Sequence, residues 1–246
     1  MIKSKRGLFL VAALTTIVAL VVTFPARIAY QWASSPLLAM SGISGTVWSG
    51  KAREFSTNGV YLRHLEWRAQ PLKLLTGKIA FSIAASPVSG FFESKIAIGL
   101  DGTTTLTDVN AALPLQMAER AVKVPGLRGE ASLQFERILL VSGRAAAMDG
   151  TITIADLVVP IVHRGSLGGY KAEFFTQNNG IVASVEDTDG VVDLAGSLQI
   201  KPDATYSFLG QVLAKPTTPD AVREQMRFLG PANERGQQEI RLEGAY

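Results

Sequence analysis

The pattern of apolar and polar residues changes after the first part of the 246-residue chain. Gly7–Phe24 is a run of eighteen residues without a charge, rich in leucine, valine and alanine, and it is long enough for one membrane helix. Over residues 42–215 the apolar positions recur mainly at every second residue, as in Ile96, Ile98 and Leu100. This spacing is typical of strands with one buried and one wetter face. We therefore expect a mainly β protein with a single N-terminal transmembrane helix.

Asx-Gly dipeptides separate many of the β-patterned segments. Both residues of such a pair tolerate positive φ, which short hairpin turns require. Parallel strands would need a long crossover, usually a helix, between successive strands, and the chain offers few helical segments. We therefore expect a curved antiparallel β-sheet that meanders from hairpin to hairpin. The five pairs are Asn58-Gly59, Asp101-Gly102, Asp149-Gly150, Asn179-Gly180 and Asp189-Gly190.

Two short helices are predicted after the N-terminal run, and both are expected to pack on the concave face of the sheet. The first covers Pro114–Val122, with proline in the first turn, where its missing N–H is tolerated. The second has Thr218 as its N-cap and Pro219 at its first helical position, and it ends at Gly230-Pro231. Its apolar residues form one helical stripe, which consists of Val222, Met226 and Leu229.

The charge distribution excludes nucleic acid as a partner. Four of the 24 basic residues lie in the first 27 positions, which contain no acidic residue. Residues 28–246 therefore hold 20 basic residues (24 minus 4) against 21 acidic ones, so the basic stripe that nucleic-acid binding needs is missing. The chain has no cysteine, which also excludes disulfides and thiolate metal sites.

No group of side chains predicts catalysis. His64 and His163 are far apart and lack neighbouring ligands at metal-binding spacing. Gly165–Gly169 is rich in glycine but does not form a Gly-x-Ser-x-Gly elbow. Glu186–Gly190 is similar to the start of a calcium loop but lacks the later bidentate acid, so we interpret it as a hairpin turn. We expect no enzyme activity, no catalytic, cofactor-binding or metal-binding residues, no cofactor and no small-molecule substrate.

The residues around the apolar run predict its orientation. Lys3, Lys5 and Arg6 precede it, and a basic excess at one end of a span holds that end in the cytoplasm. Tyr30 and Trp32 follow it and suit the membrane–water boundary. A cleaved signal peptide is the alternative, because it also consists of a basic region before an apolar run. Two features argue against cleavage. The apolar run is long, and the nearest small-x-small triplet that could serve as a cleavage motif lies well beyond it, at residues 33–35.

Several motifs, in order along nearly the whole chain, resemble one family. The most specific are Gly45–Gly50 (Gly-Thr-Val-Trp-Ser-Gly) and the later segment Leu65–Gly77, which contains Trp-x-x-x-Pro-Leu-x-Leu-Leu-x-Gly. With them the chain resembles the general secretion pathway protein N family of the bacterial type II secretion system. Further matching segments are Gly143-Arg144 with Asp149-Gly150, Leu167–Tyr170, Asp187–Gly190 with Leu194–Gly196, and Phe228–Gly230.

The resemblance implies a non-enzymatic inner-membrane component or assembly factor of the type II secretion system, which exports folded periplasmic proteins across the outer membrane. Its expected partners are inner-membrane lipids and other type II secretion subunits. The expected location is the cell inner membrane, single-pass, with a cytoplasmic N-terminus and a periplasmic C-terminal domain. The expected organisation is a cytoplasmic tail (1–6), a transmembrane anchor (7–26), a juxtamembrane connector (27–41) and a periplasmic β-rich domain (42–246).

A second interpretation stays open. The pattern also resembles membrane-anchored, β-rich proteins of AsmA-like type, which implies a lipid-binding or lipid-transfer protein with an apolar trough. An inner sheet face that is filled by its own side chains would argue against a trough, whereas a continuous open apolar groove would favour one. Trp48 and Trp67, which lie within the two most specific motifs, are expected to pack structurally and not to contact a partner.

Overall fold

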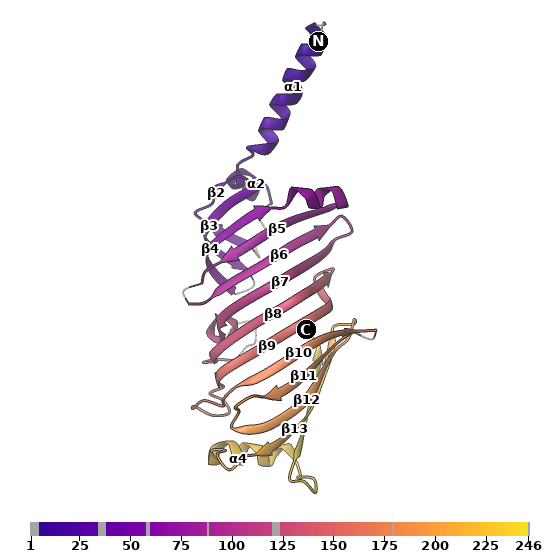
Figure 1. The fold of residues 1–246 in the computed structure, drawn as a ribbon. Helices are drawn as coiled ribbons and strands as arrows, with labels where there is room; N and C mark the ends of the chain where they lie inside the picture. The colour runs from indigo at the N-terminus through magenta and orange to yellow at the C-terminus, as the bar shows by residue number, and fades with distance from the viewer. Residues whose placement is uncertain are drawn as a thin grey trace.

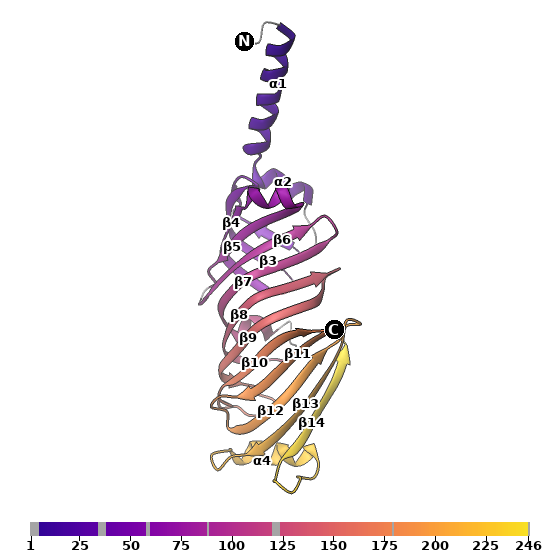
Figure 2. The ribbon, with the colours of Figure 1, turned by 45° about the vertical axis from the view of Figure 1, so that its right-hand side comes forward.

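One long antiparallel sheet dominates the protein. The computed structural model describes residues 5–33, 38–57, 60–87, 89–119, 124–178 and 180–245. Helix α1 (Lys5–Val22) projects from one end of the sheet, and α4 (Asp220–Met226) lies at the other end (Figure 1). The sheet is twisted and curved along its length (Figure 2). The mainly β class and the curved antiparallel sheet that the sequence predicts are confirmed.

The order of the strands in the sheet follows their order in the chain, and every printed pairing between strands is antiparallel. The one departure is β2, which pairs only with β3, beside β1. Within the described residues the strands are β1 (Leu38–Ser41), β2 (Ser44–Gly45), β3 (Ser49–Thr57), β4 (Val60–Ala69), β5 (Lys78–Ala85), β6 (Phe91–Gly99), β7 (Thr103–Pro114), β8 (Arg128–Val141), β9 (Arg144–Val158), β10 (Tyr170–Gln177), β11 (Gly180–Asp187), β12 (Val192–Ile200), β13 (Thr205–Ala214) and β14 (Gln238–Ala245).

The two faces of the sheet differ in chemistry. Residues paired across strands point to the same face, and the next residue along each strand points to the opposite face. One row of paired residues from β5 to β14 contains no polar side chain: Ala85, Phe92, Ala111, Leu133, Ile152, Ala172, Val185, Gly196, Gly210 and Ile240. The adjacent row, on the other face, is mostly polar: Lys51, Glu66, Ala84, Glu93, Asn110, Gln134, Thr151, Glu173, Ser184, Ser197, Leu209 and Arg241.

A glycine in the middle of β9 lets two large rings pack in the centre of the apolar face. Gly150 pairs with both Phe135 and Phe174, whose ring centroids are 5.6 Å apart. A Cβ at Gly150, where φ is +158°, would lie 2.5 Å from the Cα of Phe135. The predicted turn at Asp149-Gly150 is therefore wrong, because this glycine serves close packing inside a strand and not chain reversal.

The other Asx-Gly predictions have different outcomes. Asp101-Gly102 forms the β6–β7 turn, with φ of +79° at Gly102 and an N–H of Thr103 donated to the Asp101 carboxylate. Asp189-Gly190 lies between β11 and β12, as predicted. Asn58-Gly59 lies outside the described residues, as does Asn179, while its neighbour Gly180 begins β11.

The helices are short except for α1. Besides α1 and α4, the described residues form α2 (Ala26–Ala33) and three 3-10 helices, η1 (Pro71–Thr76), η2 (Leu115–Ala118) and η3 (Arg227–Leu229). In the described part of the helix predicted over Pro114–Val122, Pro114 ends β7, Leu115–Ala118 form a 3-10 helix and Glu119 is α-helical, while residues 120–122 lie outside the described residues. Met117 of this 3-10 helix packs against the core near β4.

Helix α1 carries apolar side chains that are exposed on all sides, among them Leu8, Phe9, Leu14 and Ile17. Within the described part of the chain, however, no helix combines the length and the apolar character that a bilayer crossing requires. The fold therefore does not support the transmembrane helix that the sequence predicts over residues 7–26.

The C-terminal helix α4 packs on the apolar face. Val222 and Met226 are buried against Val212 of β13, as the predicted stripe requires. Leu229 lies in η3 and remains 37% exposed, so the stripe is shorter than expected. Thr218 does not cap the helix, which begins after Pro219 without a side-chain cap.

Arg223 of α4 is held by the loop that precedes the helix. Its guanidinium donates hydrogen bonds to the backbone carbonyls of Thr218, Lys215 and Pro216. These carbonyls belong to the loop before α4 and lie outside its helical hydrogen bonds, and one charged donor can satisfy several of them at once. Arg223 therefore links α4 to the loop that follows β13 by hydrogen bonds.

We expect Met226→Asp to lower the free energy of unfolding by about 2–4 kcal/mol, because a carboxylate would enter an apolar site. Arg223→Ala should cost about 1–2 kcal/mol through its lost hydrogen bonds. Glu224→Ala, at an exposed position of the same helix, should stay within about 0.5 kcal/mol of the wild type. Urea unfolding of the full chain in mild detergent, followed by circular dichroism, measures all three. An unchanged midpoint for Met226→Asp would show that this stripe is not part of the core.

Candidate functional site

The motif Gly45–Gly50 forms the joint between α1 and the sheet. The indole N–H of Trp48 donates to the carbonyl of Val21, in the last turn of α1, at 2.8 Å. The N–H of Val47 donates to the carbonyl of Phe24 at 3.0 Å. The last carbonyls of a helix have no partner within the helix, and an indole N–H can only donate. The motif therefore fixes the end of α1 on the first strands.

Thr46 organises the turn inside this joint. Its hydroxyl oxygen accepts the N–H groups of Trp48 and Ser49, at 3.3 and 3.2 Å. Its carbonyl accepts the indole N–H of Trp67 at 3.2 Å. The Trp67 ring lies over Gly50, where a Cβ would approach it to 2.4 Å. Trp67 packs against the core, as predicted, and Trp48 is half-buried and bonds α1.

The connector aromatics divide between core and solvent. Tyr30 of α2 packs against the core near Met40 and accepts the Met40 N–H at 3.0 Å. Trp32 is 77% exposed and its ring contacts Phe24, with centroids 5.5 Å apart. Only Trp32 is therefore placed as the predicted boundary residue would be.

The polar face carries an open hollow of about 900 Å³ near the α1 end of the sheet. Opposite charges pair across its strands, Lys51 with Glu66 and Lys95 with Asp108, each at 2.7 Å. A second hollow of about 550 Å³ continues over β7–β10 and shares Asp108 and Asn110 with the first. We call these two hollows the polar groove. Most of its lining residues are polar, charged or small, and they are accompanied by Trp67 and Phe175.

The apolar face is filled by the protein itself in the middle of the sheet. Phe135 and Ile181 are 2% and 1% exposed, and α4 covers the far end of the same face with Val222 and Met226. Side chains of the sheet and its connections thus occupy the space that a lipid would need. This packing argues against the apolar trough of the lipid-transfer interpretation.

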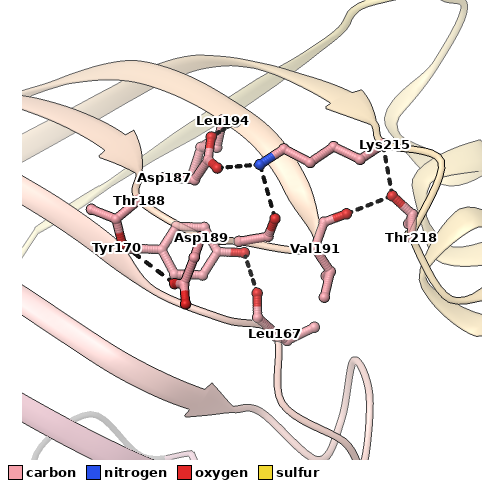
Figure 3. A network of polar contacts seen from close by, with 10 residues as sticks. Leu167, Tyr170, Asp187, Thr188, Asp189, Val191, Leu194, Lys215 and Thr218 are labelled. Carbon is pink, nitrogen blue, oxygen red and sulfur yellow. Dashed lines mark hydrogen bonds and ion pairs between the residues drawn. The ribbon is translucent and has the colours of Figure 1, made fainter.

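A polar network ties the α4 end of the sheet together (Figure 3). The Lys215 ammonium bonds the Asp187 carboxylate and the carbonyl of Gly190. Asp187 also accepts the N–H of Leu194 at 2.9 Å. Buried Thr218 accepts the Lys215 N–H at 2.7 Å and donates its hydroxyl to the carbonyl of Val191. Thr218 therefore joins two loops and is not available as a helix cap.

Two pKa values in this network are shifted. Burial acts to raise the pKa of Asp187, but the hydrogen bonds from Lys215 and the Leu194 N–H and the Lys215 charge outweigh it and lower that pKa below its usual value. Burial, and then the charges of Asp187 and Asp189, raise the pKa of Tyr170. The Tyr170 hydroxyl donates to the carbonyl of Leu167 at 3.1 Å. The acidic turn interpreted from the sequence thus has a structural role.

The remaining candidate residues do not come together. His64 is exposed on β4 and His163 lies in the β9–β10 connection. The Ser166 hydroxyl accepts the N–H of Gly168 at 3.1 Å, which is a local turn contact. Within the described residues, no three histidine, cysteine, aspartate or glutamate side chains lie close enough to hold a metal ion.

The last strand leaves one long edge of the sheet open. Within the described residues, β14 pairs with β13 on one side and with no strand on the other. At the opposite end, the edge strands β1 and β2 have only four and two residues. Short edge strands offer little backbone for further pairing. The sequence alone does not identify this edge, because it depends on the complete strand order.

We expect Asp187→Asn to cost about 1–2 kcal/mol, since it removes a charged hydrogen-bond partner of Lys215, whose partial exposure screens the pair. The folded-state pKa of Asp187 lies below the unfolded value of about 3.9. Its contribution is therefore present above about pH 4 and is lost as the pH falls through the folded-state pKa. Urea unfolding at several pH values should show the difference from wild type shrinking in acid. Asp193→Asn, an exposed position on β12, is the control, and an equal cost there would contradict this role.

Comparison with known proteins agrees with the motifs and their order. The family described as type II secretion system (T2SS), protein N, matches residues 36–241. Type II secretion system protein N of Aeromonas hydrophila is 24% identical over 97% of this chain and 96% of its own length. The protein of the same name from Vibrio cholerae serotype O1 is 22% identical over 98% of this chain and 99% of its own. No solved structure gives a significant match. The chain therefore belongs to the type II secretion system protein N family.

Proposed function

We propose that this protein is a non-enzymatic inner-membrane component or assembly factor of the type II secretion system. It holds its sheet in the periplasm, where the sheet contacts other secretion subunits and so supports export of folded periplasmic proteins across the outer membrane. The observation that carries the proposal is the long open edge of β14, at the opposite end of the sheet from α1. The family and the strand order support it together.

The proposed anchor is the uncharged run of residues 7–26, which begins inside α1 and continues beyond its end. Its exposed apolar side chains would be unfavourable in water over this length and favourable in lipid. The basic residues before it favour a cytoplasmic N-terminus. Residues 1–6 are then the cytoplasmic tail, 27–41 the connector and 42–246 the periplasmic domain.

The β14 edge suits a partner that adds a strand. Its unpaired backbone groups can receive an extended segment through main-chain hydrogen bonds, and the alternating side chains select the segment. Leu242 is 57% exposed on this strand, while Glu239, Arg241 and Glu243 alternate with the apolar positions. A partner strand with charged residues opposite Glu239, Arg241 and Glu243 would match both the unpaired backbone groups and these side chains of β14.

A photo-crosslinking amino acid at Leu242, in the full chain in cells, should crosslink to another type II secretion subunit. The same residue at Leu209, 48% exposed on the interior strand β13, is the matched control and should not. Leu242→Lys should reduce the crosslink and secretion severalfold, because an inward-pointing charge blocks edge pairing, while Leu209→Lys should not. Crosslinks from Asn110 but not from Leu242 would place the partner in the polar groove and contradict the edge.

The anchor requires that the N-terminal segment stays on the mature protein. Mass spectrometry of the protein purified from membranes should find peptides that precede Arg27. A mature chain that begins near Gln31 instead would show cleavage by a signal peptidase, and the anchor would be wrong.

A further inference from the structure

The 3-10 helix η1 exposes leucine to an unusual degree. None of its six residues is buried, and Leu72 and Leu75 are 79% and 86% exposed. Leu74 is also exposed, and Leu100 of the neighbouring turn lies beside Gly77 at the end of η1. Single exposed leucines are common, but a contiguous group on one element indicates a surface that another phase or molecule covers. We call Leu72, Leu74 and Leu75 the leucine patch.

The patch lies at the end of the sheet from which α1 emerges. The N–H of Ala69, two residues before η1, donates to the carbonyl of Trp48, whose indole bonds Val21 of α1. In Figures 1 and 2, η1 is the short helix between β4 and β5 and lies at the same end as α2. A bilayer that holds α1 would therefore lie close to this patch.

The segment that contains the patch is basic, while the neighbouring turn of Leu100 also holds one acidic residue, Asp101. Residues 67–92 contain no acidic residue, and their three basic residues are Arg68, Lys73 and Lys78. Lys73 lies within η1, between the leucines. Anionic headgroups attract lysine and arginine near the bilayer surface, and long lysine side chains reach the headgroups while their stems remain among apolar groups. Trp32, exposed on α2, adds an aromatic ring of the kind enriched at this boundary.

We propose that η1 is a second membrane contact, whose leucine patch enters the boundary between headgroups and acyl chains of the bilayer that holds α1. The occupant is the lipid surface itself, with anionic phospholipid beside Lys73. This inference rests on the proposed membrane attachment through α1. The hydrogen-bonded joint at Trp48 links the sheet to α1, and a second contact at η1 would further define the angle between the sheet and the membrane. The β14 edge is then held at a defined distance from the bilayer.

The absence of cysteine makes a direct test possible. Single variants Leu75→Cys and Phe228→Cys of the full chain are labelled with an environment-sensitive fluorophore and reconstituted in vesicles of phosphatidylethanolamine and phosphatidylglycerol. Phe228 is the matched control, since it is 85% exposed in the 3-10 helix η3 beside α4, at the far end of the sheet. Brominated lipids should quench the label at residue 75 severalfold more than the label at residue 228. Lys73→Glu should weaken the quenching at residue 75.

A third label, at Leu14→Cys in α1, separates this inference from the proposed anchor. Quenching at residue 14 without quenching at residue 75 would overturn the second contact and leave the anchor in place. No quenching at residue 14 would refute the anchor itself. Equal quenching at residues 75 and 228 would show that the fluorophore itself drives insertion. Protection of the cysteine at residue 75 from labelling in cells, without quenching in vesicles, would assign the patch to a protein partner. Each of these last two results would also overturn the proposal.

Discussion

The pairing register between strands is the constraint on which the rest of this structure depends. The row of apolar residues from Ala85 to Ile240 lies next to a polar row on the opposite face, one residue away along each strand. A slip of one residue in any ladder would therefore turn that strand's apolar residues to the polar face. A single sheet without a second covering sheet has few other ways to specify which side is buried. The alternation must therefore be maintained strand after strand, and the register shifts locally only in the β6–β7 and β8–β9 ladders among the pairings of the described residues.

Glycines within the strands are the second requirement for packing the apolar face of this single curved sheet. Large rings on the apolar face must lie over neighbouring strands, because no opposite sheet provides pockets for them. Glycines beneath these rings provide the space: a Cβ would approach the ring of Trp67 to 2.4 Å at Gly50 and that of Phe208 to 2.6 Å at Gly196. The same arrangement recurs at Gly150 under Phe135. These glycines allow close approach within strands, so they are part of the core and not of the turns.

The two ends of the sheet differ in the elements to which they are connected. At the first end, hydrogen bonds from Trp48 and Val47 join the sheet to the end of α1, and the leucine patch lies nearby. At the other end, the Asp187–Lys215 pair and α4 hold the last strands together, while β14 remains open on one side. The first end of the sheet is thus joined to α1, and the other end leaves the backbone groups on one side of β14 without a neighbouring strand among the described residues.

The sequence by itself determined the features that depend on local spacing. The period of two predicts the strands, the Asx-Gly turn at Asp101 predicts chain reversal, and Val222 with Met226 predicts the buried side of α4, because each signal lies within a few residues. Tertiary structure decided the positions whose partners lie far along the chain. Gly150 looks like a turn glycine until its strand lies between Phe135 and Phe174, and Thr218 looks like a cap until the carbonyl of Val191 accepts its hydroxyl. The open edge at β14 likewise appears only when all strands are paired, since no local pattern records which side of a strand lacks a neighbour.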